Sequence, residues 1–345
     1  MKRAPLRGVR KMAVLQPGAL DDFMFCLPAL HALKHSYPEA QLVYLGLPWH
    51  ARFLAGRAGP VHRVLPAPDM AATGAPAEAL VDAMRRASFD LVLQMHDGGR
   101  HANPLVRRFE ARLAVGLRSA DAAPLDRWLA HGAPVNRRLQ LLEVAALAGA
   151  TAWPMDAGLH VTGADRLLAA QLLPPASGQR LALIHPGAAE ARQRWPPARF
   201  AAVADALVEE GATVAIHGAA ADAPLTRAVL GAMRHQAIDL AGKASLPALC
   251  GLLARCELVV ANDSGALHMA LALGKPCVGI YGAASLLASA PLCQQGHRAA
   301  ASLRMACPVC GAGHAAASCP HPASLVDDVA LAEVTALAID LFRAA

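Results

Sequence analysis

Residues 257–283 hold two short apolar runs on either side of a helical segment, and this order constrains the fold more than any other feature of the chain. The stretch reads ELVVANDSGALHMALALGKPCVGIYGA. ELVVA and CVGIYG have the length and composition of buried strands, ALHMALAL has helical spacing, and NDSG and GKP are turn-forming clusters. This order predicts a right-handed β-α-β unit, whose first loop lies at the carboxyl edge of a parallel sheet, where open α/β sheets bind ligands.

The predicted first loop, Asn262-Asp263-Ser264-Gly265, stands directly before the helix. Asp263 or Ser264 can cap the helix, and Gly265 has no Cβ and lets a ligand come close to backbone N–H groups. A helix start of this kind attracts an anion, most often a phosphate. The same residues also suit a plain N-cap, and the motif alone leaves both interpretations open.

The rest of the chain repeats the alternation of strands and helices, with a proline-rich interruption near its middle. Further strands are predicted at residues 12–16, 41–46, 61–66, 90–95, 181–187 and 212–218, and helices at 23–37, 77–87, 104–114, 136–149, 197–210, 222–233, 245–255 and 325–343. A chain of 345 residues, 55% hydrophobic and 17% charged, can bury two cores. We predict an α/β protein with two Rossmann-like doubly wound domains, at residues 1–165 and 181–324, joined by a linker at 166–180 and followed by a C-terminal helix at 325–345.

The formal charge of +6 is concentrated in the first half of the chain, where eight arginines fall between residues 100 and 138 against three acidic residues. Such clustering suits an anionic partner, a phosphorylated glycolipid or an acidic membrane face, although a solvated surface is the ordinary explanation of any single arginine. Nucleic acid is the weakest choice of partner, because aromatic residues make up only 4% and no nucleic-acid-binding motif is present.

The chain has no apolar run long enough to span a bilayer and no signal-peptide pattern near its first residue, so we expect a cytoplasmic protein in peripheral contact with the inner membrane face. Four of its eight cysteines lie in apolar helix or strand patterns, which is typical of reduced core thiols. They are Cys26, Cys250, Cys256 and Cys277.

Four blocks of the chain resemble those of the family 9 glycosyltransferases, the heptosyltransferases of lipopolysaccharide core assembly. In order, they read LQPGALDDFMFCLPALHAL, IHPGAAEARQRWPPARFAAVADAL, DLAGKASLPALCGLL and NDSGALHMALALGKPCVGIYG, and they cover most of residues 12–283. The resemblance implies a GT-B fold with two domains facing a central cleft, an ADP-heptose-like donor, a lipopolysaccharide core or related saccharide acceptor, and inverting transfer without a catalytic metal or other cofactor. Two alternatives stay open: a catalytically idle or divergent GT-B protein that binds sugar nucleotides, and a sugar-nucleotide epimerase, which the proline-rich RWPP block disfavours.

Asp22 matches the aspartate that serves this family as general base. Transfer of a sugar from a nucleoside diphosphate needs a carboxylate near the acceptor hydroxyl, and cations or N–H groups around the leaving diphosphate. The family's usual Gly-Asp is Asp21-Asp22 here. The alternative role for either aspartate is to cap the helix that begins near Phe23.

The resemblance assigns donor binding to the second half of the chain. Where the family usually has Lys-Arg-Trp-Pro, this chain has Gln193-Arg194-Trp195-Pro196, so Arg192 or Arg194 is expected to supply the missing charge, since arginine can bind phosphate in a bidentate manner. The predicted donor-binding residues are His185, Pro186, Gly187, Arg192, Arg194, Asp263, Ser264, Gly265 and His268, although packing is the alternative for the last. The predicted acceptor-binding residues are Arg100, His101, Asn103 and Arg107.

Cysteines near the end of the sequence form the last candidate site. Residues 307–310 read CPVC, with one cysteine upstream and one downstream, and four thiolates suit a structural zinc or iron ion. The predicted ligands are Cys293, Cys307, Cys310 and Cys319. His314 and His321 can replace a missing sulfur. Free thiols in a loop are an equally weighted alternative, because one CxxC without a second pair is a weak signal.

Overall fold

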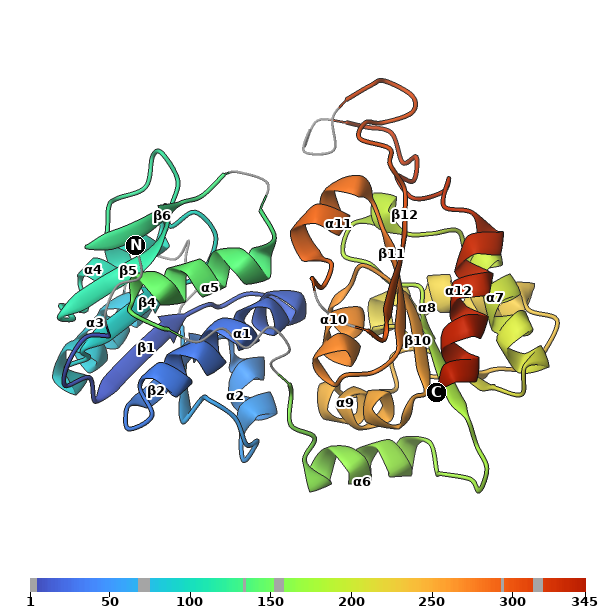
Figure 1. Cartoon of the computed structure of the whole chain (residues 1–345), viewed down its shortest axis with the longest axis horizontal. Coiled ribbons are helices and arrows are strands. Elements are labelled where there is room, and N and C mark those ends of the chain that lie inside the picture. The colour runs from blue at the N-terminus through green and yellow to red at the C-terminus, as the bar shows by residue number, and fades with distance from the viewer. Residues whose placement is uncertain (1–4, 68–74, 133–134, 152–157, 293–294, 313–318) are drawn as a thin grey trace. The chain divides into compact units, whose positions relative to one another are not determined.

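The computed structural model describes residues 5–67, 75–132, 135–151, 158–292, 295–312 and 319–345, and it divides into two compact units, residues 1–160 and 161–345 (Figure 1). Each unit contains one six-stranded sheet in which all neighbouring strands are parallel. Helices connect the successive strands, except for β5 and β6, which a loop joins, so each unit is a doubly wound α/β domain.

The sheet of unit 1 has the strand order β3-β2-β1-β4-β5-β6. Its strands are β1 (Lys11–Leu15), β2 (Gln41–Gly46), β3 (Arg63–Pro66), β4 (Leu91–Gln94), β5 (Leu113–Arg118) and β6 (Arg127–Ala130), and its helices are α1 (Leu20–Ser36), α2 (Pro48–Leu54), α3 (Ala75–Ala87), α4 (Ala102–Arg107) and α5 (Arg137–Leu147). The strand order reverses between β1 and β4, so the loops that follow these two strands lie next to each other at the carboxyl edge of the sheet.

Helices cover the sheet of unit 1, as a parallel sheet requires. A hydrophobic cluster joins β1, β2 and β4 to α3 and α4, with Leu15, Val81 and Val106 among its buried members. Helices α1 and α5 pack side by side (Figure 1). This packing places the first residues of α1 and α5 close together, which matters for the site below.

The sheet of unit 2 has the strand order β12-β11-β10-β7-β8-β9. Its elements are α6 (Gly163–Leu172), β7 (Leu181–His185), η1 (Ala191–Gln193), α7 (Pro197–Glu209), β8 (Thr213–Ile216), η2 (Ala220–Asp222), α8 (Ala223–Ala232), β9 (Ile238–Asp239), α9 (Leu246–Arg255), β10 (Leu258–Asn262), α10 (Gly265–Ala272), β11 (Cys277–Tyr281), α11 (Ala283–Ser289), β12 (His297–Ala301) and α12 (Leu331–Ala344). Helix α12 packs beside α7, and both contribute to the main core of this unit together with Trp195 (Figure 1). The strand order reverses between β7 and β10, which brings the loops after these strands together.

The β-α-β unit predicted at residues 257–283 is confirmed. It consists of β10, α10 and β11, and the two strands pair in parallel with Val259 opposite Cys277. Burial of every residue in both strands explains why their sequences are continuously apolar.

The helix predicted at 104–114 is wrong beyond Arg107, where α4 ends, because residues 113–118 form β5. A short apolar run does not by itself distinguish a buried strand from a buried helix. The fold uses Gly116 for close strand packing, since a Cβ there would lie 2.7 Å from the backbone oxygen of Gln94. The final helix begins at Leu331 instead of Leu325, because Leu325 enters the core within a non-helical segment.

Helix α6 occupies much of the segment predicted as a linker. It packs against α9 so closely that a Cβ on Gly251 would lie 2.1 Å from the backbone oxygen of Asp165. The division between the two units falls before this helix, between residues 160 and 161. Among the described helices, none combines the length and apolarity needed to cross a membrane.

Candidate active site

In unit 1, Asp22 lies in the first turn of α1, directly after the loop that follows β1. Its Oδ2 accepts a hydrogen bond from the backbone N–H of Ala19 at 3.0 Å, and its Oδ1 forms an ion pair with Nη2 of Arg137, the first residue of α5. The Asp22 side chain is 18% exposed. The carboxylate therefore caps the helix with one oxygen and pairs with a cation through the other, while a part of it stays accessible.

Gly18 makes room for this carboxylate. A Cβ at Gly18 would lie 2.3 Å from Oδ2 of Asp22 and 2.6 Å from the side-chain nitrogen of Gln16. Gln16 holds the same loop in place, because its Oε1 accepts hydrogen bonds from the Gly18 N–H at 3.1 Å and from the Tyr44 hydroxyl at 3.0 Å. The loop thus fixes the position of Asp22 through contacts that only a glycine permits.

The surroundings of Asp22 are apolar and contain few charges. Burial raises the pKa of Cys26 and of Tyr44, and the negative charge of Asp22 adds to both effects. Burial also lowers the pKa of His50 to about 4, although Asp22 acts in the opposite direction. Arg137, whose guanidinium lies 5.0 Å from the ring centre of Phe25, pairs with Asp22 and balances its charge.

The predicted acceptor residues follow β4 and fall into two groups. Arg100, His101 and Arg107 are exposed, and Arg100 pairs with Asp121. Asn103 differs from the prediction, because its side chain is fully buried and its Nδ2 donates to the backbone oxygens of residues 117 and 123 at 3.1 and 2.9 Å. Its amide holds the end of β5 in place, so it is not exposed to an acceptor in this structure.

In unit 2, the loop after β10 supplies the start of α10. Ser264 is the N-cap, and its Oγ accepts a hydrogen bond from the N–H of Leu267 at 3.4 Å. Asp263 does not cap the helix: its Oδ1 lies 2.7 Å from Nε2 of His268, and its Oδ2 accepts a hydrogen bond from the Ser289 hydroxyl at 2.8 Å. The side chains of Asp263 and Ser264 therefore hold the loop between β10 and α10 in place. His268 is buried, as expected if it packs in the core instead of facing the donor.

Asn262 connects this loop to the loop that follows β7. Its side chain is fully buried, its Oδ1 accepts from the backbone N–H of Trp195 at 3.1 Å, and its Nδ2 donates to the backbone oxygen of Pro186 at 2.7 Å. One amide thus holds the two loops together. The sequence identifies Asn262 only as a turn residue, because its partners are 67 and 76 residues away along the chain.

Two buried histidines stand at the carboxyl ends of β7 and β8. His185 and His217 face each other with their Nδ1 atoms 3.1 Å apart, and burial lowers the pKa of His185 to about 4 and that of His217 to about 3. A Cβ at Gly187 would lie 2.8 Å from Oδ2 of Asp222. Because both histidines are neutral near pH 7, positive charge in this region has to come from other residues.

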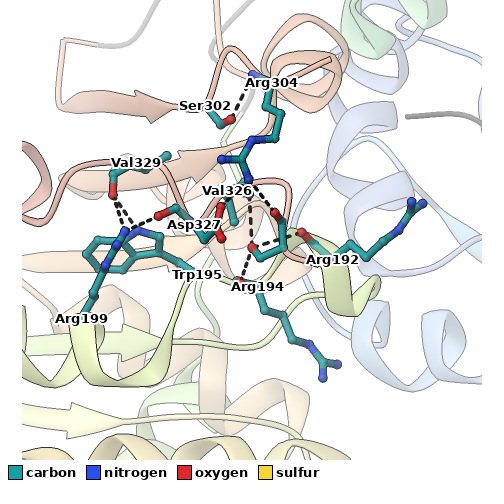
Figure 2. Close-up of polar contacts among 10 residues, drawn as sticks. Arg192, Arg194, Trp195, Arg199, Ser302, Arg304, Val326, Asp327 and Val329 are labelled. Atoms are coloured by element: carbon teal, nitrogen blue, oxygen red, sulfur yellow. Dashed lines mark hydrogen bonds and ion pairs between the residues drawn. The ribbon is translucent and has the colours of Figure 1, made fainter. Parts of the chain in front are cut away.

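The two candidate arginines leave the same turn in different directions (Figure 2). Arg194 donates from Nε and Nη2 to the backbone oxygen of Ala188, at 3.1 and 2.9 Å, and Nη2 lies 3.7 Å from Asp222. Arg192 instead pairs with Glu190 at 2.6 Å, which is the main cause of its raised pKa. Arg194 is therefore the arginine that lies along the loop carrying Gly187.

Comparison with known proteins decides the family. The model of glycosyltransferase family 9 (heptosyltransferase) matches residues 77–306. The chain belongs to this family. The family 9 assignment and the glycosyltransferase class predicted from the sequence are thereby confirmed, and the epimerase alternative is not favoured.

The family 9 protein is similar to curated heptosyltransferases. It is 27% identical to lipopolysaccharide heptosyltransferase 2 of Salmonella typhimurium over 82% of this chain and 85% of that protein. It is 36% identical to lipooligosaccharide heptosyltransferase 2 of Haemophilus influenzae over a shorter alignment, which covers 29% of this chain and 30% of that protein.

Solved structures confirm the predicted fold class. The ADP-heptose lipopolysaccharide heptosyltransferase II of Escherichia coli superposes with a TM-score of 0.76 at 20% identity, covering 97% of this chain and 99% of that one. A dodecameric iron-containing heptosyltransferase, TibC, gives a TM-score of 0.58 at 14% identity, covering 99% of this chain and 78% of that one. The family 9 protein thus has the two Rossmann-like domains of a GT-B glycosyltransferase.

The cysteines of the family 9 protein separate into two kinds. Those predicted to be core thiols, Cys26, Cys250, Cys256 and Cys277, are buried and take part in no disulfide. In the C-terminal segment, Cys307, Cys310 and Cys319 lie together with His321, all four donor atoms falling within 4.8 Å of one another. Cys293 and His314, which the sequence also offered as ligands, lie outside the described residues.

Proposed function

We propose that this protein transfers a heptose-like sugar from a nucleoside diphosphate donor, ADP-heptose, to a lipopolysaccharide core or related saccharide acceptor. The family match supports the reaction class, and the curated relatives are named as lipopolysaccharide heptosyltransferases. A related fold, with a TM-score of 0.61 and 19% identity, was solved as the Escherichia coli heptosyltransferase WaaC with ADP-2-deoxy-2-fluoro heptose. The observation that carries the mechanism is the accessible carboxylate of Asp22, fixed at the carboxyl edge of the sheet of unit 1.

Asp22 is the general base of the proposed reaction. The acceptor hydroxyl oxygen attacks the anomeric carbon as the bond from that carbon to the diphosphate oxygen breaks, and the hydroxyl proton passes to the Asp22 carboxylate. Attack from the face opposite the leaving diphosphate inverts the configuration of the anomeric carbon. Arg137 is the positioning residue, because its pairing with Oδ1 and the Ala19 N–H bond to Oδ2 set the orientation of the carboxylate.

The leaving diphosphate is proposed to bind at the start of α10 and to Arg194. A helix N-terminus and a guanidinium both stabilise negative charge that develops on the leaving group. Asn262 supports this arrangement by tying the start of α10 to the loop after β7. The proposed reaction has no step that requires a metal, whereas the thiols of the C-terminal segment suit a structural one.

The exposed residues Arg100, His101 and Arg107 are proposed to contact an anionic acceptor on the cytoplasmic side of the inner membrane, where the protein binds peripherally. Arg100 already pairs with Asp121, as Arg108 does with Glu78 and Arg112 with Asp90, so an acceptor phosphate would have to compete with Asp121 for Arg100. Cosedimentation with anionic and neutral vesicles tests the membrane contact, which we expect to weaken as salt is raised.

A transfer assay tests the function. Purified protein is incubated with truncated lipopolysaccharide and ADP-, UDP-, GDP- or CMP-sugars, and products are followed by mass spectrometry. We expect a mass increase of one heptose with the ADP-linked donor. Donor binding without transfer to any acceptor would instead support the idle sugar-nucleotide-binding alternative.

A further inference from the structure

The four donor atoms of Cys307, Cys310, Cys319 and His321 lie within 4.8 Å of one another, close enough for a single metal ion to bind them together. Cys310 Sγ and Cys319 Sγ are 3.6 Å apart, and Cys319 Sγ and His321 Nδ1 are also 3.6 Å apart. A tetrahedral ion with Zn–S bonds of about 2.3 Å and a Zn–N bond of about 2.05 Å separates neighbouring sulfurs by ~3.8 Å and sulfur from nitrogen by ~3.6 Å. The three cysteines are free thiols, so no disulfide accounts for their approach.

Backbone hydrogen bonds hold Cys307 and Cys310 in one tight turn. The N–H of Gly311 donates to the backbone oxygen of Cys307 at 2.9 Å, and the N–H of Cys307 donates to Ala312 at 2.8 Å. Gly311 adopts a left-handed conformation, with φ of 71°, which a glycine adopts without strain. Backbone N–H groups of Val309 and Cys310 point at the Cys307 sulfur, as donors do around a metal-bound thiolate.

We propose that Cys307, Cys310, Cys319 and His321 bind one thiophilic divalent cation, Zn²⁺ or Fe²⁺, in a tetrahedral site with three thiolates and one imidazole. This set replaces the four cysteines predicted from the sequence. His321 takes the fourth position because it follows Cys319 by two residues and reaches it with Nδ1. Soft thiolates with one imidazole are ligands that both ions accept.

Arg192 is the positioning residue of this site. Three thiolates and a divalent cation leave a net charge of about −1, which a neighbouring cation stabilises when the site is partly desolvated. The guanidinium of Arg192 pairs with Glu190, its side chain is only 16% exposed, and Cys319 adds to the rise in the pKa of Arg192 that Glu190 mainly causes. This role accounts for the direction that Arg192 takes away from Arg194.

The metal site belongs to the segment that covers the turn at residues 192–195. Just after His321, Leu325 N–H donates to the backbone oxygen of Arg192 at 2.7 Å, and Ser324 Oγ donates to that of Arg194 at 3.0 Å. Arg304, just before the cysteines, donates to the backbone oxygen of Ser324 at 3.0 Å. The cation would therefore close a loop whose two ends are already joined beside the turn that bears Arg194.

Metal analysis of the full chain, purified under reducing conditions and reconstituted with Zn²⁺ or Fe²⁺, tests the proposal. We expect about one equivalent of metal, and X-ray absorption with three sulfurs at about 2.3 Å and one nitrogen at about 2.0 Å. Elemental analysis shows which of the two ions the purified protein carries. Less than about a tenth of an equivalent after reconstitution, or a shell of four sulfurs, overturns the proposed ligand set.

Variants assign the ligands one at a time. Cys319→Ser and His321→Ala should lose the metal, whereas Cys293→Ser should keep it. His321→Cys should bind metal again, and the absorption spectrum of its cobalt-substituted form should shift toward that of a site with four thiolates. Retention by His321→Ala together with loss by Cys293→Ser would overturn the assignment of His321. Circular dichroism checks that each variant is folded.

Arg192→Gln tests the positioning role, with Arg227→Gln, at an exposed site of α8, as the matched control. Loss of a neighbour that tunes a metal site typically lowers affinity by roughly 10-fold or more. Competition with a chelator should show this loss for Arg192→Gln and none for Arg227→Gln. Equal affinities in both variants would refute the role of Arg192.

Discussion

Gly18→Ala should displace the proposed base without removing any charge from the protein. The new Cβ would meet Oδ2 of Asp22 at 2.3 Å, whereas ordinary contacts begin at 3.4 Å, so the carboxylate has to move by about 1 Å. A displacement of that size can lower the rate by roughly 100-fold, or about 2.7 kcal/mol of transition-state stabilisation. Loss of the hydrogen bond from the Ala19 N–H should cost about 1 kcal/mol of unfolding free energy in addition.

Steady-state transfer kinetics and urea unfolding separate these two effects. The control is Gly231→Ala in α8, where a Cβ meets nothing within 4 Å and alanine favours the helix, so the rate should be unchanged and the stability equal or slightly higher. We expect kcat/KM of Gly18→Ala to fall about 100-fold with most of the protein still folded. A rate within a factor of three of the unmodified protein would refute the argument that the position of Asp22 controls the chemistry.

Three further predictions concern the base, the diphosphate and pH. Asp22→Asn should lower turnover by roughly 100-fold or more with little change in donor affinity, and Asp21→Asn should do much less; the reverse order would place the base one residue earlier. Arg194→Gln should weaken ADP binding by about 10-fold in calorimetry, because a charge-assisted contact to the diphosphate contributes on the order of 1.5 kcal/mol, and unchanged affinity would move the phosphate site elsewhere. His185 and His217 have pKa values lowered by burial from 6.5 to about 4 and about 3, so the unfolded chain binds more protons below pH 6.5 and stability falls as the pH drops from there toward 4. These two histidines together change the free energy of unfolding by at most about 2.7 kcal/mol per pH unit. Urea unfolding of His217→Asn between pH 7.5 and 5 should show this pH dependence reduced by about half.

The sequence predicts the parts of the fold in which local pattern and tertiary environment agree. Strand β10, α10 and β11 carry apolar runs, turn residues and helical spacing that all indicate the same element. Strand β5 is not predicted from the sequence because its first five residues are all buried and so lack the alternation that identifies a half-buried strand. A short buried run is therefore predicted correctly only where turn residues and neighbouring helical spacing mark its ends, as they do for β10 and β11.

The site was only partly predictable because its contacts join distant residues. Asp22 is singled out by the resemblance of its block to the family 9 glycosyltransferases, but its partner Arg137 is 115 residues away and stands at a helix start that nothing in the local sequence connects to it. The C-terminal ligands show the same limit in another form. The sequence offers Cys293 as a fourth ligand and His321 as a replacement, and among the described residues it is His321 that lies in the cluster, with Nδ1 3.6 Å from Cys319 Sγ.

The carbonyl oxygen of Val329 receives both the indole N–H of Trp195, at 3.0 Å, and the guanidinium of Arg199, at 2.9 Å. This acceptor belongs to the main chain, and every side-chain replacement at position 329 leaves it in place. A scan of point mutations would therefore record position 329 as tolerant whenever the new side chain fits, and would overlook the atom on which the Trp195 turn depends. Replacing the amide between Val329 and Ala330 by an ester, which weakens this carbonyl as an acceptor, is the substitution that would expose that dependence.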